Sequence, residues 1–143
     1  MDTLYDDDVI AWVEQQVALM RAGRWSELDV DNIVEEIEDV GKSEKKELES
    51  RLAVLMSHLL KWQLQPDFRG PSWINTIREQ RKSIRHRLKK SPSLRRLLSD
   101  DDWLAETYRR AKIETYASTP LTQLPDSMPW PLEDAMAMDF LPD

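Results

Sequence analysis

The sequence predicts an all-α fold, a bundle of four or five helices built around one long helix at about residues 31–63. First, apolar residues recur every three or four positions along that stretch, which is the pattern of a single amphipathic helix. Second, no stretch alternates as a strand does. Third, the links between periodic stretches are short, which favours antiparallel neighbouring helices. The apolar stripe consists of Ile33, Ile37, Val40, Leu48, Leu52, Leu55, Leu59 and Trp62.

The first helix is expected over about residues 8–22, where apolar residues recur at helical spacing between Val9 and Met20. A run of aspartates precedes it, and negative charge is favourable at a helix N-terminus. Gly23 follows the last periodic residue, as a C-terminal cap does. Trp25 lies in the short link that follows, and we expect it to pack into the end of the core.

The long helix is expected to begin near Asp29 or Asp31, because aspartate is a good N-cap. Gly41 lies inside the stripe, and the register continues across it. We therefore expect a kink or a local loosening there rather than a break. A break, with Ser43 capping a new helix, is the alternative. Glu44 occupies a stripe position, so it should either be exposed or have a partner.

Residues 63–71 form a short link punctuated by proline and glycine. Ser72 is expected to cap the next helix, which should run antiparallel to the long one. The pair Ser91-Pro92 ends that helix and starts another turn, since proline suits a first helical position. The aspartates at 100–102 are expected to cap a further helix.

The last part of the chain, about residues 118–143, contains five prolines and cannot form a long helix. Residues 132–138 could form about two turns. This tail packs if Trp130, Phe140 and Leu141 dock on the bundle. We expect it to do so, which makes residues 1–143 a single domain.

Charge is segregated along the chain. Residues 1–49 hold 15 acidic and 5 basic side chains, residues 50–100 hold 3 and 12, and residues 101–143 hold 9 and 3. The simplest interpretation is that the basic middle folds against the acidic ends. The alternative is a basic face that stays open to phosphate or nucleic acid.

Several function classes are disfavoured by composition. There is no cysteine, which excludes disulfides, thiol catalysis and thiolate metal sites. There is no glycine-rich phosphate loop, and no apolar run approaches the roughly 20 residues of a membrane span. The acidic N-terminus lacks the basic and apolar regions of a signal peptide, so we expect a cytoplasmic protein without integral membrane association.

Metal binding and catalysis find little support. A run of acidic side chains on the long helix could hold a cation, namely Glu35, Glu36, Glu38 and Asp39. The simpler interpretation is that they face solvent or form ion pairs with the basic segment. His58 lies too far along the same helix to join them, and no second histidine lies within a turn of it. Serine, base and orienting acid do not converge either. We expect no cofactor, no metal site and no catalytic residue.

One polar and aromatic cluster is the main candidate binding site. Hairpin geometry about the 63–71 link should bring position 58 near 78 and position 61 near 75. The residues brought together in this way could form a small pocket for an anion or a nucleotide, with tryptophan side chains as its walls. The alternative is a hydrogen-bonded lid that closes the helical hairpin. The cluster consists of His58, Lys61, Trp62, Gln65, Ser72, Trp73 and Arg78.

A basic face follows on the same helix, at Lys82, Arg85 and Lys89 within the basic segment 78–96. These side chains could hold phosphates, yet no aromatic residues are interleaved with them for base stacking. An amphipathic basic helix can also bind a partner protein, although a solvated face is the default. Arg81 lies inside the apolar stripe and needs a partner, for which we expect Glu106 or Glu114.

Several short strings together resemble one family, the bacterial family catalogued as domain of unknown function 29. The resemblance covers nearly the whole chain and implies a compact all-helical fold with no established activity. The family's middle motif matches the candidate cluster, but no catalytic residue can be carried over. The strings are Tyr5-Asp6, Gly23-Arg24-Trp25-Ser26, Leu28-Asp29, Glu35-Glu36-Ile37-Glu38, His58-Leu59-Leu60-Lys61-Trp62, Gln65-Pro66, Ser72-Trp73, Ser91-Pro92-Ser93-Leu94 and Asp139-Phe140-Leu141-Pro142.

The sequence therefore favours a small non-enzymatic helical module that binds a protein partner. The alternative is a binder of phosphate groups, nucleic acid or nucleotide that uses the basic segment 78–96 and the tryptophan-flanked cluster. Salt dependence separates the two, because nucleic-acid binding weakens steeply with salt.

Overall fold

The computed structural model describes residues 3–143, which form helices and, over that range, no strand. They divide into two compact units, one ending at Glu44 and the other running from Lys45 to Asp143. The long helix α3 (Val30–Leu64) contributes residues to both units. The all-α fold built on one long helix is confirmed, whereas its description as a single domain stays a prediction.

The unit ending at Glu44 contains α1 (Leu4–Asp7), α2 (Val9–Arg21), the 3-10 turn η1 (Trp25–Glu27) and the first part of α3. Asp8 caps α2, and its Oδ1 accepts a hydrogen bond from the Ala11 N–H at 3.1 Å. Gly23 has a φ of 69°, the left-handed conformation that glycine adopts at a helix C-terminus. These two ends fix the length of α2 close to the expected range.

Asp29 joins α2 to the start of α3. Its carboxylate accepts hydrogen bonds from the Trp12 Nε1 at 2.9 Å and the Asn32 Nδ2 at 2.8 Å, and its N–H donates to the Gln16 Oε1 at 2.8 Å. The hydrogen bonds from Asn32 and Trp12 lower the pKa of the Asp29 carboxyl. Trp12 and Gln16 are buried, so this polar junction replaces an apolar core between the two helices.

One expectation for this part of the chain is wrong, whereas the expected continuity of the long helix across Gly41 is confirmed. Trp25 is 64% exposed and does not plug a core. Gly41 lies inside a helix that runs without interruption from Val30 to Leu64, so no new helix is capped by Ser43. The apolar stripe predicted on α3 is buried over only part of its length, because Ile37 and Val40 are each 67% exposed whereas Leu48 is fully buried.

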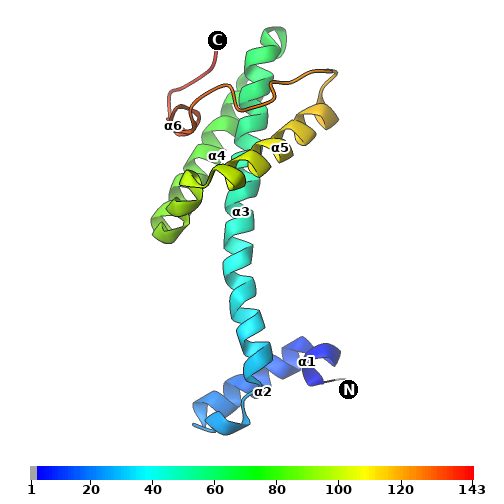
Figure 1. The fold of residues 1–143 in the computed structure, drawn as a ribbon, viewed down its shortest axis with the longest axis vertical. Helices are drawn as coiled ribbons and strands as arrows, with labels where there is room; N and C mark the ends of the chain where they lie inside the picture. The colour runs from blue at the N-terminus through cyan, green and yellow to red at the C-terminus, as the bar shows by residue number, and fades with distance from the viewer. Residues whose placement is uncertain (1–2) are drawn as a thin grey trace. The chain divides into compact units, whose positions relative to one another are not determined.

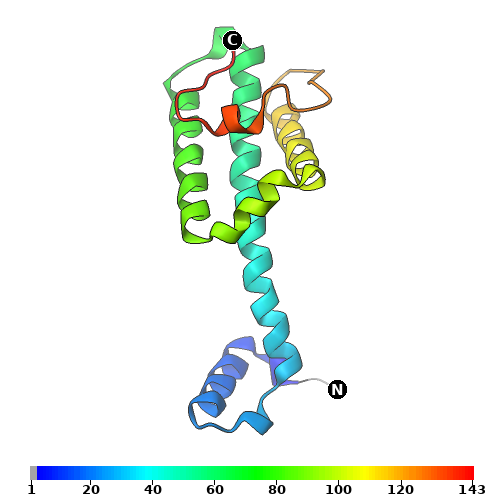
Figure 2. The same ribbon diagram turned by 60° about the vertical axis from the view of Figure 1, so that its left-hand side comes forward.

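The unit from Lys45 to Asp143 holds the hydrophobic core. The last part of α3 packs with α4 (Pro71–Lys90) and α5 (Asp101–Ser118), and Figures 1 and 2 show α4 running antiparallel to α3. Two 3-10 segments, η2 (Pro66–Phe68) and η3 (Pro92–Ser99), connect these helices. The core residues on α3 are Leu48, Leu52, Ala53, Leu55, Met56, Leu59 and Leu60.

The ends of α4 and α5 show which cap residues were identified correctly. Gly70, not Ser72, is the N-cap of α4, because Pro71 already occupies its first helical position. Asp100 caps α5 as expected, and its Oδ1 accepts a hydrogen bond from the Trp103 N–H at 3.1 Å. The Ser91-Pro92 boundary also holds, since α4 ends at Lys90.

The C-terminal segment lies against this bundle and includes the short helix α6 (Leu132–Met136) (Figure 2). Trp130 is buried, and its Nε1 donates to the Gln63 Oε1 at 2.9 Å. The Tyr108 hydroxyl donates to the Pro125 carbonyl at 2.7 Å, and burial raises the pKa of Tyr108 to about 12. Side chains of α3 and α5 thus hold a segment that has little regular structure.

Arg81 provides the strongest attachment of this segment. Its side chain on α4 is only 3% exposed. The Nε donates to the Ala135 carbonyl at 2.9 Å, the Nη1 to Met138 at 3.2 Å and the Nη2 to Phe140 at 2.7 Å. The expected partners Glu106 and Glu114 are therefore wrong, because backbone carbonyls satisfy the guanidinium.

A buried hydroxyl pair joins α3 to α5. The Ser57 and Thr115 hydroxyl oxygens lie 2.7 Å apart, and the Thr115 hydroxyl donates to the Ala111 carbonyl at 2.8 Å. Since the Thr115 hydrogen is used within α5, the Ser57 hydroxyl must be the donor between the helices. The two residues are therefore not equivalent.

Replacing Arg81 with methionine should lower the free energy of unfolding by about 2–4 kcal/mol, because three carbonyls lose a charged donor in a site with little water. Urea denaturation followed by tryptophan fluorescence measures this change. Lys82→Met, at an exposed neighbour, should change stability by less than about 0.5 kcal/mol. Equal stabilities for the two variants would contradict the role assigned to Arg81.

Thr115→Val should destabilise the protein more than Ser57→Ala. The first variant leaves a buried hydroxyl without its acceptor, at about 1–3 kcal/mol, whereas the second removes one hydrogen bond worth about 1 kcal/mol and leaves Thr115 bonded to Ala111. A double-mutant cycle by urea denaturation measures both values. The reverse order would show that Thr115, not Ser57, is the donor between the helices.

Candidate functional site

His58, the centre of the predicted cluster, is half-buried on α3. Its Nδ1 lies 2.9 Å from the Val54 carbonyl one turn earlier, which makes Nδ1 the protonated nitrogen and leaves Nε2 as an acceptor. Burial lowers the pKa of His58, and the nearby Lys61 ammonium lowers it further. The imidazole is therefore neutral near pH 7 and cannot serve as a positive anion ligand.

The other cluster members on α3 have partners of their own. Burial lowers the pKa of Lys61, and the Glu114 carboxylate on α5 acts in the opposite direction. Trp62 makes a cation–π contact with Arg69 in the link, not with a member of the predicted cluster. The Arg69 guanidinium carbon lies 5.1 Å from the ring centroid. The Arg69 Nε also donates to the Trp62 carbonyl at 2.7 Å. Gln65 is half-buried at the start of η2.

The cluster members on α4 are differently exposed. Ser72 and Arg78 are exposed, while Trp73 is half-buried. Within residues 3–143, no hydrogen bond or ion pair joins these three to the members on α3. The grouping of the seven residues as one binding site stays a prediction.

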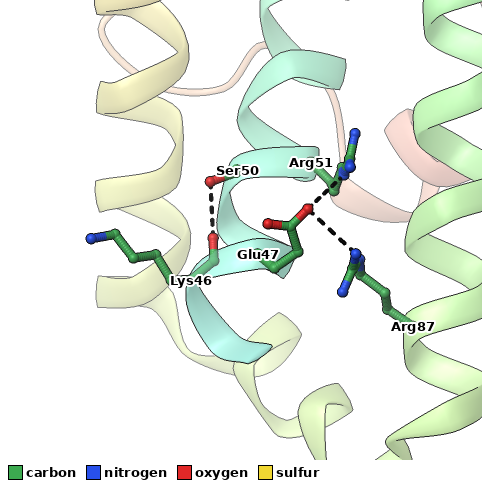
Figure 3. Close-up of polar contacts among 5 residues, drawn as sticks. All are labelled: Lys46, Glu47, Ser50, Arg51 and Arg87. Atoms are coloured by element: carbon green, nitrogen blue, oxygen red, sulfur yellow. Dashed lines mark hydrogen bonds and ion pairs between the residues drawn. The ribbon is translucent and has the colours of Figure 1, made fainter. Parts of the chain in front are cut away.

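An ion pair between α3 and α4 supports the hairpin register on which that grouping depends. The Glu47 Oε1 accepts from the Arg87 Nη2 at 3.3 Å and from the Arg51 Nε at 3.0 Å, as Figure 3 shows. The expected pairing of positions 58 and 78 differs from the pairing of 47 and 87 by only two residues along one helix. Glu47 also shows that an acidic residue of α3 meets the basic helix.

The basic face itself is exposed at Lys82, Arg85 and Lys89. Lys82 lies 3.8 Å from Glu79 in an exposed pair that contributes little. In the part of the chain that the structure describes, Arg85 and Lys89 have no ion pair. These two side chains are thus available to an outside partner, unlike Arg81 and Arg87.

A groove that the sequence did not reveal lies within the unit ending at Glu44, between α2 and the first part of α3. Its volume is about 310 Å³, and its lining is almost entirely apolar. Apolar side chains from both helices face the groove at helical spacing. The lining residues are Trp12, Val13, Gln16, Val17, Met20, Ile33, Glu36, Ile37 and Val40.

One acidic side chain, Glu36 on α3, lines this groove. Glu36, in the lining, accepts a hydrogen bond from the Tyr5 hydroxyl at 2.6 Å, and this bond raises the pKa of Tyr5. Glu35, Glu38 and Asp39 are exposed, and among residues 3–143 none of them has an ion pair with a base. The groove therefore has an almost entirely apolar lining, and the uncompensated acidic side chains lie on the same helix outside that lining.

The apolar repeats on both helices could be seen in the sequence, where they were interpreted as core. The sequence could not show that they remain open, because periodicity predicts which face of a helix is apolar but not what covers it. The uncompensated acidic run beside Ile37 was the available signal.

Comparison with known proteins identifies a family but no activity. The family described as Domain of unknown function DUF29 matches residues 4–141, nearly the whole chain. The chain belongs to this family. No curated protein and no solved structure matches the DUF29 chain. The expected family is thereby confirmed, and its description assigns no chemistry to any residue.

Two structural observations concern metals and membranes. Over residues 3–143 of this DUF29 chain, no three side chains of histidine, aspartate or glutamate gather in a way that could hold a metal ion. Over the same range, no helix combines the length and apolar character needed to cross a membrane.

The free energy of unfolding should depend on pH through His58. Because the folded-state pKa lies below the ordinary value of 6.5, the unfolded chain takes up a proton more readily. Stability should be fully present above about pH 6.5 and decrease as pH falls toward the folded pKa. His58→Gln should flatten this slope, measured by urea denaturation between about pH 5.5 and 7.5.

His86, which is exposed on α4, provides the matched control. His86→Gln should leave the slope unchanged, because this side chain is exposed to water. If the unfolding free energy of the His58→Gln variant depended on pH as steeply as that of wild type, His58 would not be the source of the pH dependence.

Proposed function

We propose that this DUF29 chain is a small non-enzymatic module that binds a protein partner, and that the groove between α2 and the first part of α3 takes a basic amphipathic helix of that partner. The exposed apolar groove, in a part of the chain with a large excess of acidic side chains, is the observation that carries this proposal. The proposal includes a cytoplasmic location, the compartment that the sequence predicted.

Apolar exposure supports a protein partner. Ile37 and Val40 belong to a repeating helical stripe and still leave most of their surface open to water. Contiguous exposed apolar surface of this kind marks interaction sites on folded proteins. A groove between two helices suits an incoming helix that presents apolar residues three and four positions apart.

Charge supports a basic partner. Residues 3–44 contain 12 acidic and only 3 basic side chains. Lysine and arginine on an incoming helix would be attracted by this net negative charge. An acidic helix would be repelled, so the net charge of this part of the chain as well as the apolar groove would select the partner.

Site-specific photo-crosslinking tests the occupant. The full chain carrying benzoylphenylalanine in place of Ile37 is irradiated in extract of cells that express it, and mass spectrometry identifies the crosslinked segment. A lysine- and arginine-rich amphipathic segment of another protein is expected. An acidic segment, or a segment from a second copy of this chain, would overturn the proposal.

Substitutions in the groove provide the quantitative test. A synthetic peptide corresponding to the crosslinked segment should bind the Ile37→Ser, Val40→Ser double variant at least about tenfold more weakly than wild type, because two apolar anchors are lost. Ile113→Ser, at a 58% exposed position on α5, is the control and should bind as wild type. Equal binding by the groove variant would contradict the proposal.

Exposure of Arg85 and Lys89 favours a second candidate, a binder of phosphate groups or nucleic acid that uses the basic segment 78–96 and the His58 cluster. Binding of labelled single-stranded RNA at low and moderate salt tests it. A steep loss with salt that disappears in Arg85→Gln, Lys89→Gln would support this candidate. Binding unaffected by both changes would exclude it.

A further inference from the structure

A larger cavity lies wholly within the unit from Lys45 to Asp143, between α4, η3 and the C-terminal segment. Its volume is about 660 Å³, which is the size of a small-molecule pocket. Aliphatic and thioether side chains and one proline make up most of the lining. They are Ile84, Leu88, Leu98, Pro131, Leu132 and Met136.

Three arginines also line this cavity, and they have different roles. Arg81 donates to backbone carbonyls and so holds the wall formed by α6. Arg85 on α4 and Arg95 on η3 are exposed, and within residues 3–143 neither has a hydrogen bond or ion pair. The lining contains one acidic side chain, Glu133, so positive charge is in excess.

We propose that this cavity binds a small apolar carboxylic acid, with its hydrocarbon part on the aliphatic lining and its carboxylate between Arg85 and Arg95. Guanidinium groups match a carboxylate with paired N–H donors, which gives charge-assisted bonds of defined geometry. The lining has no aromatic side chain on which a nucleobase could stack. Its chemistry therefore favours an aliphatic ligand over a nucleotide.

The attachment by Arg81 explains why the cavity has a defined shape. Leu132 and Met136 belong to α6, which the bonds from Arg81 to Ala135 and Met138 hold in place together with the packing of Leu132, Ala135 and Met136 on the core. The wall is thus built by tertiary contacts rather than by a long element. This site is separate from the groove beside α2, and the inference does not rest on the proposed function.

Fluorescence titration of the full chain with cis-parinaric acid, a polyene fatty acid, tests the inference. Wild type should bind one equivalent saturably. The double variant Arg85→Gln, Arg95→Gln should bind at least about tenfold more weakly, since the carboxylate loses both charged donors. Absence of saturable binding by wild type, or equal binding by the double variant, would overturn the inference.

The matched control is Lys89→Gln, Arg96→Gln. It removes the same charge from α4 and η3 at exposed positions that do not line the cavity. Its affinity should equal that of wild type, and a tenfold loss would show that only net charge is sensed. Circular dichroism of all variants checks that the helices remain.

Two further ligands distinguish the contribution of the carboxylate to binding from that of the hydrocarbon chain. The methyl ester of parinaric acid should bind wild type and the Arg85, Arg95 variant equally, because it has no charge for the arginines to contact. Inorganic phosphate at the same concentration should fail to displace the acid. Displacement by phosphate would overturn the inference, because the apolar lining would then contribute nothing.

Discussion

The burial of one guanidinium governs how the last part of this chain is placed. Arg81 occupies a core-facing position of α4, where an unpaired charge would be very costly. Its three nitrogen donors reach the carbonyls of Ala135, Met138 and Phe140. These carbonyls lie at the end of a five-residue helix or beyond it and lack a full set of helical partners. The guanidinium and the unpaired carbonyls thus satisfy each other's hydrogen-bonding groups. The same bonds help to place α6, whose Leu132 and Met136 line the cavity.

The two units use apolar residues in opposite ways. In the unit from Lys45 onward, Leu48 and its neighbours on α3 are fully covered by α4, α5 and the C-terminal segment. In the unit ending at Glu44, Asp29 makes a polar junction between α2 and α3, and Ile37 and Val40 remain open. The same periodic pattern therefore forms a core in one unit and an open apolar groove in the other. The DUF29 chain thus presents two chemically distinct hollows, an apolar groove in one unit and a cavity lined partly by arginine in the other.

Some structural features follow from local signals in the sequence, such as helix caps, whereas others depend on how distant residues pack. Asp100 capped α5 as expected, because capping depends on a few neighbouring residues. The prediction that Ser72 caps α4 is wrong, since Pro71 occupies the first helical position and Gly70 is the N-cap. The register of α3 against α4 followed from a short link and agrees with the ion pair of Glu47 and Arg87. The partner of Arg81 did not follow, because a charge can be satisfied by carboxylates or by carbonyls, and only packing decides between them.

By itself the sequence determined the helical class, the long helix, the family and the residues that form each apolar stripe. These properties follow from periodicity and from capping, which act over a few residues along one helix. Only the tertiary structure decided which stripe is covered, where Arg81 finds its acceptors and which arginines meet at one cavity. Those outcomes depend on residues far apart in the chain, as the contacts of Arg81 with Phe140 and of Gln63 with Trp130 illustrate. The candidate sites for function therefore emerge from packing, whereas the helices that carry them are encoded locally.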